Sequence, residues 1–312
     1  MAVGLGEDRI NVVHLRRNGE RSFTLVHCSS HAKDLGDTTT LTRLERELRL
    51  SRLPCVVPLQ VGEYQLLQVE PPAVAPEEMK AAIRWRIKEL IDYSPEEATL
   101  DILEIPEDRK TTRNRFVYVA CSPNNIIQRY VRAFQAARVP LLAIDIPELA
   151  QRNLARLFEP AGRGIALLSF DSKGSLVTVS CAGELYLARR IELTLAQLMA
   201  AGDEQRQSMM ERLVLELQRS LDNLERQYRS ISVAKMLVSP VPDTVPLRDF
   251  LGQNLQMPVE TLKLHEVIDF SAVSDMDDPA RQGEYLPLLG AALRGLLEPA
   301  APTKEEGARA AA

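Results

Sequence analysis

Apolar and polar residues alternate along the first half of the chain in a way that predicts short strands between helices. Residues 9–15 and 22–28 are two strand-like runs, and the Asn18-Gly19 pair between them is typical of a hairpin. Apolar residues spaced three and four apart predict helices in the same half. The remaining predicted strands lie at residues 55–59, 63–71, 100–106, 116–121 and 141–145, and the predicted helices at residues 42–50, 77–91, 124–139 and 147–158.

The pattern starts again after a polar stretch with two glycines at residues 159–164. The strands predicted after it lie at residues 165–170, 175–181, 184–193, 235–239 and 259–264, and the helices at residues 203–229, 246–255 and 287–297. Each half of the chain is therefore a run of strands followed by alternating helices and strands. This repetition predicts an α/β fold with two lobes and a cleft between them.

We predict three regions along the chain. Residues 1–160 form the first lobe, with a small α+β subdomain inserted at about residues 72–140, and residues 161–297 form the second lobe. Residues 298–312 contain no large apolar side chain, so we expect a disordered tail there.

The only tryptophan, Trp85, lies on the predicted helix at residues 77–91. The apolar stripe of that helix consists of Met79, Ile83, Ile87, Leu90 and Ile91. Trp85 lies nearly opposite this stripe, with the small residues Ala81 and Ala82 beside it. Two interpretations stay open: another part of the subdomain covers the ring, or the ring is exposed and binds a partner, as tryptophan often does at interfaces.

The composition excludes several classes of function. The net charge is −5, the Lys and Arg residues are spread along the chain, and aromatic residues make up only 5%, so we expect no nucleic-acid binding. No stretch approaches the ~20 apolar residues of a membrane helix, and the N-terminus does not resemble a signal peptide. We therefore expect a cytoplasmic protein that reaches a membrane only through partners.

No metal site or common catalytic motif is predicted. His27, Cys28 and His31 lie close together, but no fourth ligand is near them in the sequence, and the four cysteines match no zinc or redox spacing. The chain also lacks a Walker loop, a nucleophile elbow and a dinucleotide-binding glycine pattern after a strand.

Four stretches of the sequence together resemble one family. They are PEEATLDILEI at 95–105, LLAIDIPELAQRNL at 141–154, GELYLARRIEL at 183–193 and LELQRSLDNLERQY at 215–228. Their order and spacing resemble the PilM group of type IV pilus assembly proteins, and more narrowly the MshI relatives of MSHA-type pilus biogenesis. The resemblance covers most of residues 1–297, and no single motif in it is specific.

The resemblance implies an actin-like fold, built as a ribonuclease H-like repeat in two lobes, with an inserted small subdomain. It implies a cytoplasmic protein at the inner membrane that captures the cytoplasmic segment of a PilN-like (MshJ-like) bitopic membrane protein. It leaves open a contact with the pilus assembly ATPase. Several members of the family bind ATP in the cleft.

The expected phosphate turn of this chain departs from the family pattern. Ser169 stands where the resemblance implies an aspartate, and Asp171 stands where it implies a glycine. A carboxylate at that position would repel phosphate, and Lys173 would offset only part of its charge. We interpret Ser172, Lys173 and Gly174 as an ordinary turn between two strands.

The two other expected cleft loops depart as well. Residues 4–8 lack the Asp-x-Gly order, Asn11 falls near an expected lysine, and residues 239–243 replace an expected Gly-Gly. We therefore expect a non-catalytic scaffold without a cofactor. The alternative, an actin-like protein that binds or hydrolyses ATP with Mg²⁺, stays open. A metabolic kinase of the same fold would need a catalytic aspartate that the sequence does not supply.

Overall fold

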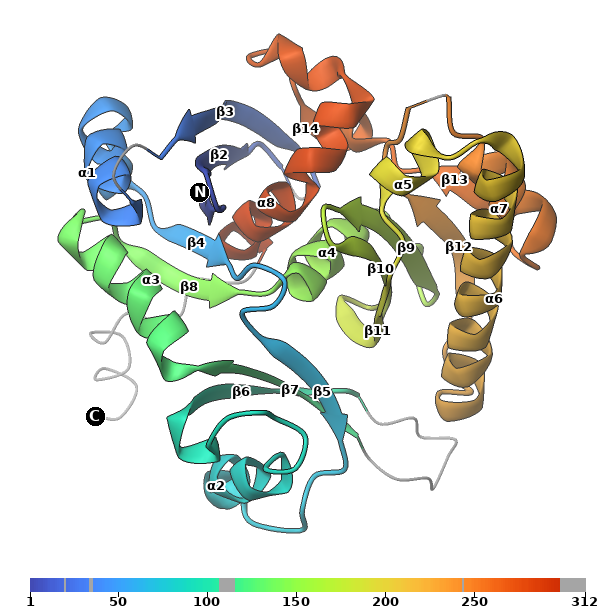
Figure 1. Cartoon of the computed structure of the whole chain (residues 1–312), viewed down its shortest axis with the longest axis horizontal. Coiled ribbons are helices and arrows are strands. Elements are labelled where there is room, and N and C mark those ends of the chain that lie inside the picture. The colour runs from blue at the N-terminus through green and yellow to red at the C-terminus, as the bar shows by residue number, and fades with distance from the viewer. Residues whose placement is uncertain (20, 34–35, 107–115, 243, 298–312) are drawn as a thin grey trace.

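The computed structural model describes residues 1–19, 21–33, 36–106, 116–242 and 244–297 (Figure 1). Two mixed sheets of the same topology form its main body, and a third, smaller sheet lies below them in Figure 1. The predicted tail at residues 298–312 lies outside the described residues.

The first sheet has the strand order β14-β3-β2-β1-β4-β8. Strands β1, β2 and β3 are antiparallel, and β4 and β8 run parallel to β1. The strands are β1 (Ala2–Leu5), β2 (Arg9–Arg17), β3 (Phe23–Ala32), β4 (Cys55–Pro58), β8 (Leu141–Asp145) and β14 (Ile268–Asp269). All four residues of β1 are buried, as expected of a central strand with both faces covered.

The second sheet repeats this arrangement in the order β11-β10-β9-β12-β13. Three antiparallel strands are again followed by two parallel ones. The strands are β9 (Gly164–Asp171), β10 (Gly174–Cys181), β11 (Glu184–Ile191), β12 (Val233–Val238) and β13 (Val259–Thr261). The sequence therefore predicted the repeat correctly.

The third sheet is antiparallel, with the order β5-β7-β6. It consists of β5 (Gln65–Val69), β6 (Ala98–Glu104) and β7 (Val117–Pro123), and helix α2 (Pro76–Arg86) packs on it through Ile83. The predicted subdomain at residues 72–140 differs from this unit at both ends. Strand β5 precedes residue 72, and helix α3 (Asn124–Ala136) contacts helix α1 (Asp37–Leu48) and β8 as well as β6 and β7 of this sheet.

Two helices separate the main sheets. Helix α4 (Pro147–Ala155) packs on the second sheet, helix α8 (Pro279–Leu297) packs on β1, β2 and β4, and the two helices contact each other closely (Figure 1). From Tyr285 to Leu293, where α8 is buried between the two layers, the helix is apolar around its whole circumference. The last part of the predicted second lobe, residues 161–297, thus returns to the first sheet, where β14 pairs with β3.

The remaining helices surround these layers. They are α5 (Leu195–Ala200), α6 (Asp203–Gln227) and α7 (Leu247–Asn254), with 3-10 turns at Leu50–Arg52, Pro95–Glu97, Leu264–Glu266 and Ser274–Asp277. Helix α6 packs along β11 and α7. Among the described helices, none is long and apolar enough to cross a membrane.

Candidate functional site

The turn between β9 and β10 holds the residues that the sequence singled out as a phosphate turn. The carboxylate of Asp171 accepts a hydrogen bond from the backbone N–H of Lys173 at 2.8 Å and one from the guanidinium of Arg190 at 2.7 Å. Ser172 and Lys173 are the exposed residues of a tight turn. A backbone donor that could face a ligand is therefore already bonded to a carboxylate of the chain.

Gly174 is required at the end of this turn because of a close backbone approach. A Cβ atom at this position would lie 2.6 Å from the carbonyl oxygen of Ile191, at the end of β11. The glycine therefore serves strand packing, as the turn interpretation of the sequence expected.

Ser169 is buried beneath the turn, and its hydroxyl forms a hydrogen bond with another side chain of the protein. Its hydroxyl donates to Gln151 Oε1 at 2.5 Å, and Gln151 Nε2 donates to Leu167 O at 2.5 Å and to Thr178 Oγ1 at 3.0 Å. Gln151 comes from α4, so these bonds fasten the second sheet to that helix. The Ser169 hydroxyl is thus committed to a structural contact.

Arg190 links the turn to helix α4. Its Nη1 lies 2.7 Å from Asp171 Oδ2, and its Nε lies 3.6 Å from Oε1 of Glu148 in the first turn of α4. The hydroxyl of Tyr64, in the connection between β4 and β5, donates to Glu148 Oε2 at 2.6 Å. Burial raises the pKa of Glu148, which is only 4% exposed. Four chain segments therefore meet at one charged cluster.

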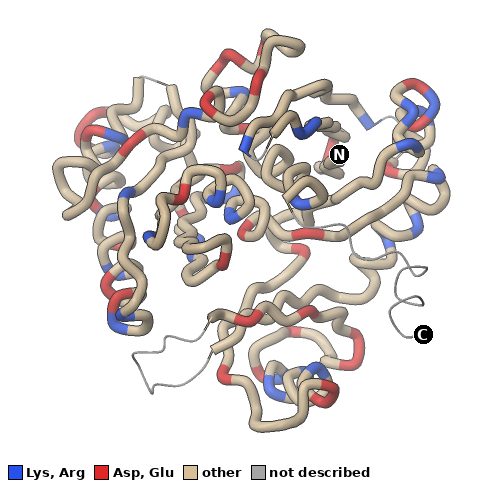
Figure 2. Tube along the Cα trace, turned by 180° about the vertical axis from the view of Figure 1, so that it is seen from behind, with Lys and Arg blue, Asp and Glu red and all other residues tan. Residues whose placement is uncertain are grey.

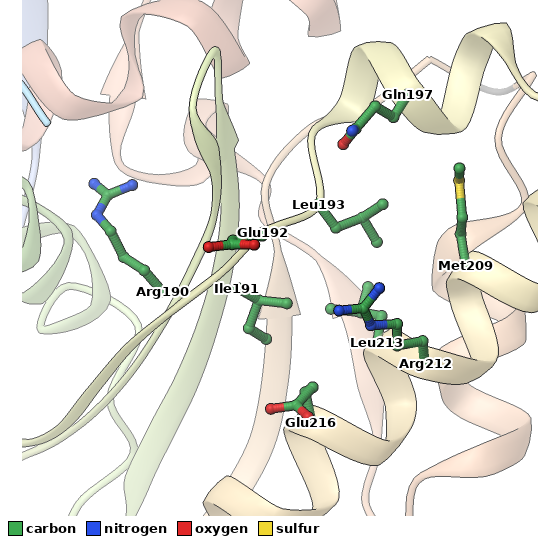
Figure 3. Close-up of a pocket in the computed structure, with 9 residues that line it drawn as sticks. All are labelled: Arg190, Ile191, Glu192, Leu193, Gln197, Met209, Arg212, Leu213 and Glu216. Atoms are coloured by element: carbon green, nitrogen blue, oxygen red, sulfur yellow. The ribbon is translucent and has the colours of Figure 1, made fainter.

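Two cavities adjoin Arg190. One of about 360 Å³ lies between the end of β11 and helix α6, with Arg212 and Glu216 at its polar side (Figure 3). Its apolar lining comes from Ile191, Leu193, Met209 and Leu213. Figure 3 shows Arg190 pointing away from α6. A second cavity of about 230 Å³ is lined by Tyr64, Leu66 and Glu148, on the side of the third sheet.

The two other expected cleft loops are also closed by contacts within the protein. In the turn after β1 the N–H of Gly6 bonds to Arg9 O at 2.9 Å, and Leu288 of α8 packs against Gly4. In the loop after β12, Ser239 is buried and its N–H donates to Leu168 O at 2.7 Å. Asp243 of that loop lies outside the described residues.

Trp85 lies on the outer face of α2 and is 63% exposed. Ala81 is exposed and Ala82 is half-buried on the same face, while Ile83 packs on the sheet. Lys88 Nζ lies 5.9 Å from the centre of the Trp85 ring. The interpretation in which another part of the subdomain covers the ring does not agree with this exposure.

The histidines that attracted attention in the sequence are bonded to a serine. Nε2 of His27 and Nε2 of His31 lie 2.7 Å and 2.8 Å from the hydroxyl oxygen of Ser29. Within residues 1–297, leaving out the undescribed positions, no group of three acidic, histidine or cysteine side chains is arranged to hold a metal ion.

The fold is similar to that of solved structures. A chain of the PilM–PilN type IV pilus biogenesis complex superimposes with a TM-score of 0.68, at 18% sequence identity, over 95% of this chain and 98% of that chain. The chain has the actin-like fold. The fold class predicted from the sequence is thus confirmed.

Two further structures are similar at lower scores. A protein with an actin-like ATPase fold and unknown function from Bacteroides thetaiotaomicron has a TM-score of 0.48, at 10% identity over 88% of this chain and 93% of that one. The cytoplasmic domain of EpsL, an inner-membrane component of the type II secretion system of Vibrio cholerae, has a TM-score of 0.45, at 13% identity over 78% and 82%. No protein-family model and no curated protein sequence matches the chain.

Proposed function

We propose that this protein is a non-catalytic scaffold of a type IV pilus assembly platform of the MSHA type. It lies on the cytoplasmic side of the inner membrane and binds the cytoplasmic segment of a PilN-like (MshJ-like) bitopic membrane protein. A second contact with the pilus assembly ATPase is part of the proposal. The similarity to a chain of the PilM–PilN complex over almost the whole length of both chains supports it.

The proposal that the protein is non-catalytic is supported by the hydrogen bonds of the turn between β9 and β10. Asp171 holds both the turn N–H of Lys173 and the guanidinium of Arg190. A phosphate at this turn would have to displace the Asp171 carboxylate from its hydrogen bond with a backbone N–H and from its charge-assisted hydrogen bond with a guanidinium. The cavity beside Arg212 and Glu216 favours the alternative, an ATP-binding protein, because its volume suits a small ligand.

We predict that Mg-ATP and Mg-ADP do not raise the melting temperature of the purified protein. A ligand at 100 times its dissociation constant adds about 2.7 kcal/mol of stability, which differential scanning fluorimetry detects as a shift of several degrees. The control is an actin-like ATPase measured in the same buffer. A saturable upward shift of this protein would favour the ATP-binding alternative.

We predict that the exposed face of α2 contacts the partner through Trp85, with Ala81 and Ala82 leaving room beside the ring. Trp85→Ala should weaken binding of the PilN-like cytoplasmic segment by more than ~1 kcal/mol, because buried tryptophans carry much of the energy of interfaces. The melting temperature should change little, since the ring is 63% exposed. Calorimetric titration with the partner peptide measures the affinity.

Leu215→Ala is the matched control for this experiment. Leu215 is an apolar side chain on α6 that is 52% exposed, far from α2 in the sequence and on a different unit. Its removal should leave the affinity unchanged. If Trp85→Ala and Leu215→Ala bind the partner equally well, the docking surface lies elsewhere on the molecule.

A further inference from the structure

Helices α1 and α3 contact each other and end at the same edge of the first sheet. The chain after α1 enters β4, the chain after α3 enters β8, and these two parallel strands begin side by side. Cys55 pairs with Leu141, and the N–H of Cys55 donates to Pro140 O at 2.8 Å. The residues that precede the two strands are therefore close together, although they are far apart in the sequence.

Five exposed arginines lie on this edge and on the adjoining C-terminal halves of the two helices. Arg52 and Arg138 each stand three residues before the paired positions of β4 and β8. None of the five forms an ion pair with any residue that the structure describes. Figure 2 shows Lys and Arg positions following one another along the side where α1 and α3 lie. We refer to these five side chains as the basic end: Arg46, Arg49, Arg52, Arg132 and Arg138.

Few acidic residues balance the basic end. Residues 124–139 contain none, and Glu47 is the only one in residues 46–54. A cation near a helix C-terminus is common because it offsets the partial negative charge there, and Arg49 and Arg138 fit that explanation. The other arginines add like charges that repel one another. A surplus of positive charge therefore remains for an anion outside the chain.

The basic end has charge but no apolar centre. None of the large apolar side chains that are exposed in the described residues lies on α1, on α3 or on the turns that follow them. Leu142 of β8, the nearest of them in the sequence, is turned toward α8 at Gly295. An interface with a folded protein needs apolar anchors at its centre, whereas a layer of anionic headgroups attracts basic side chains by charge alone.

We propose that the basic end binds anionic lipid headgroups and turns the α1–α3 side of the protein toward the membrane surface. Its guanidinium groups donate paired N–H bonds to the headgroup phosphates. The membrane partner recruits the protein, and the basic end fixes its orientation at the surface. This inference rests on the proposed place of the protein at the inner membrane.

Vesicle flotation with the protein alone tests the lipid contact. We expect the protein to float at low salt with vesicles of phosphatidylcholine and phosphatidylglycerol, and not with phosphatidylcholine alone. Because an anionic surface repels a chain of net charge −5 as a whole, such binding needs a local basic surface. High salt should abolish it by screening. Equal flotation with both kinds of vesicle, or none with the anionic vesicles at low salt, would overturn the proposal.

Paired substitutions locate the contact. Arg52→Gln with Arg138→Gln should lower the partition onto anionic vesicles at least about tenfold, since each basic residue near the surface contributes about fivefold. Arg52→Lys with Arg138→Lys keeps the charge and should retain most of the binding. A loss as large with lysine as with glutamine would contradict a contact made by charge.

The matched control is Arg226→Gln with Arg229→Gln. These are two exposed arginines at the C-terminal end of α6 that likewise form no ion pair with a described residue. The control changes the net charge by the same amount and should leave the partition unchanged. An equal loss in both pairs would mean that the basic end is not the contact surface.

Duplex DNA is the competing anionic surface, because its backbone phosphates also bind arginine. Binding of a labelled duplex in fluorescence anisotropy, without flotation on anionic vesicles, would assign the basic end to nucleic acid and refute the lipid contact. The partner-binding assay is independent of both measurements. Intact binding of the partner segment without vesicle binding refutes only this inference, whereas a partner segment that does not bind refutes the proposed function.

Discussion

Replacing Gly290 by alanine is expected to lower the free energy of unfolding by about 3 kcal/mol or more. A Cβ atom on residue 290 would lie 2.1 Å from the carbonyl oxygen of Ala150 and 2.5 Å from its carbonyl carbon. The backbones of α8 and α4 therefore touch at this crossing. Neither helix can move away easily, since α8 is fixed on the first sheet and α4 on the second.

Denaturant unfolding measures this effect, and Gly252→Ala is its matched control. Gly252 lies within helix α7, where an added Cβ would find its nearest atom, Val259 Cβ, at 4.0 Å. The control should gain up to ~1 kcal/mol from the better helix propensity of alanine. Equal stability of Gly290→Ala and the unmodified protein would mean that the two helices are not held at this distance.

The repeat of strands and helices could be predicted from the sequence because it is a local pattern. The hairpin at Asn18-Gly19 and the meander after residue 164 have strand periodicity with turn residues between the strands. The position of α8 could not be predicted in this way. Its contact with β1 and β2 joins residues more than 250 positions apart, and an apolar helix carries no sign of which sheet it covers.

The helix predicted at residues 77–91 ends at Arg86 in the structure. Beyond it the chain tightens, because the N–H of Lys88 bonds to Trp85 O and that of Leu90 bonds to Ile87 O, each three residues back. Leu90, which the predicted stripe placed on the apolar face, is therefore 51% exposed. The hydrophobic period could not locate this change, because Ile87 and Ile91, before and after Leu90, both remain buried.

Only part of the charged cluster could be predicted from the sequence. The turn residues from Ser169 to Gly174 were recognised because they are contiguous. Arg190 and Glu148 were not singled out, because each partner comes from a different element and no spacing links them. A charged residue in the middle of the apolar strand run at 184–193 is the only local sign, and it is also consistent with an exposed strand face.

The second large effect concerns Arg190. Arg190→Met is expected to cost about 3–5 kcal/mol of stability, because it leaves Glu148 buried without a cation. Arg189→Met, the adjacent arginine, is the matched control. Its side chain is 46% exposed and pairs with Glu216, so the loss should be at most about 1 kcal/mol after solvent screening. Urea unfolding of both variants gives the comparison.

The pH dependence of the stability of Arg190→Met shows whether Glu148 is the group that causes the loss. Burial already raises the pKa of Glu148, and loss of the arginine removes an attraction that lowers it. Between the unfolded value of about 4.3 and the raised folded value, the folded protein binds the extra proton, so stability falls as the pH rises through that window. Arg190→Met should therefore be more stable at pH 5 than at pH 8. Adding Glu148→Gln should abolish this slope and restore part of the stability, whereas an unchanged slope would assign it to another group.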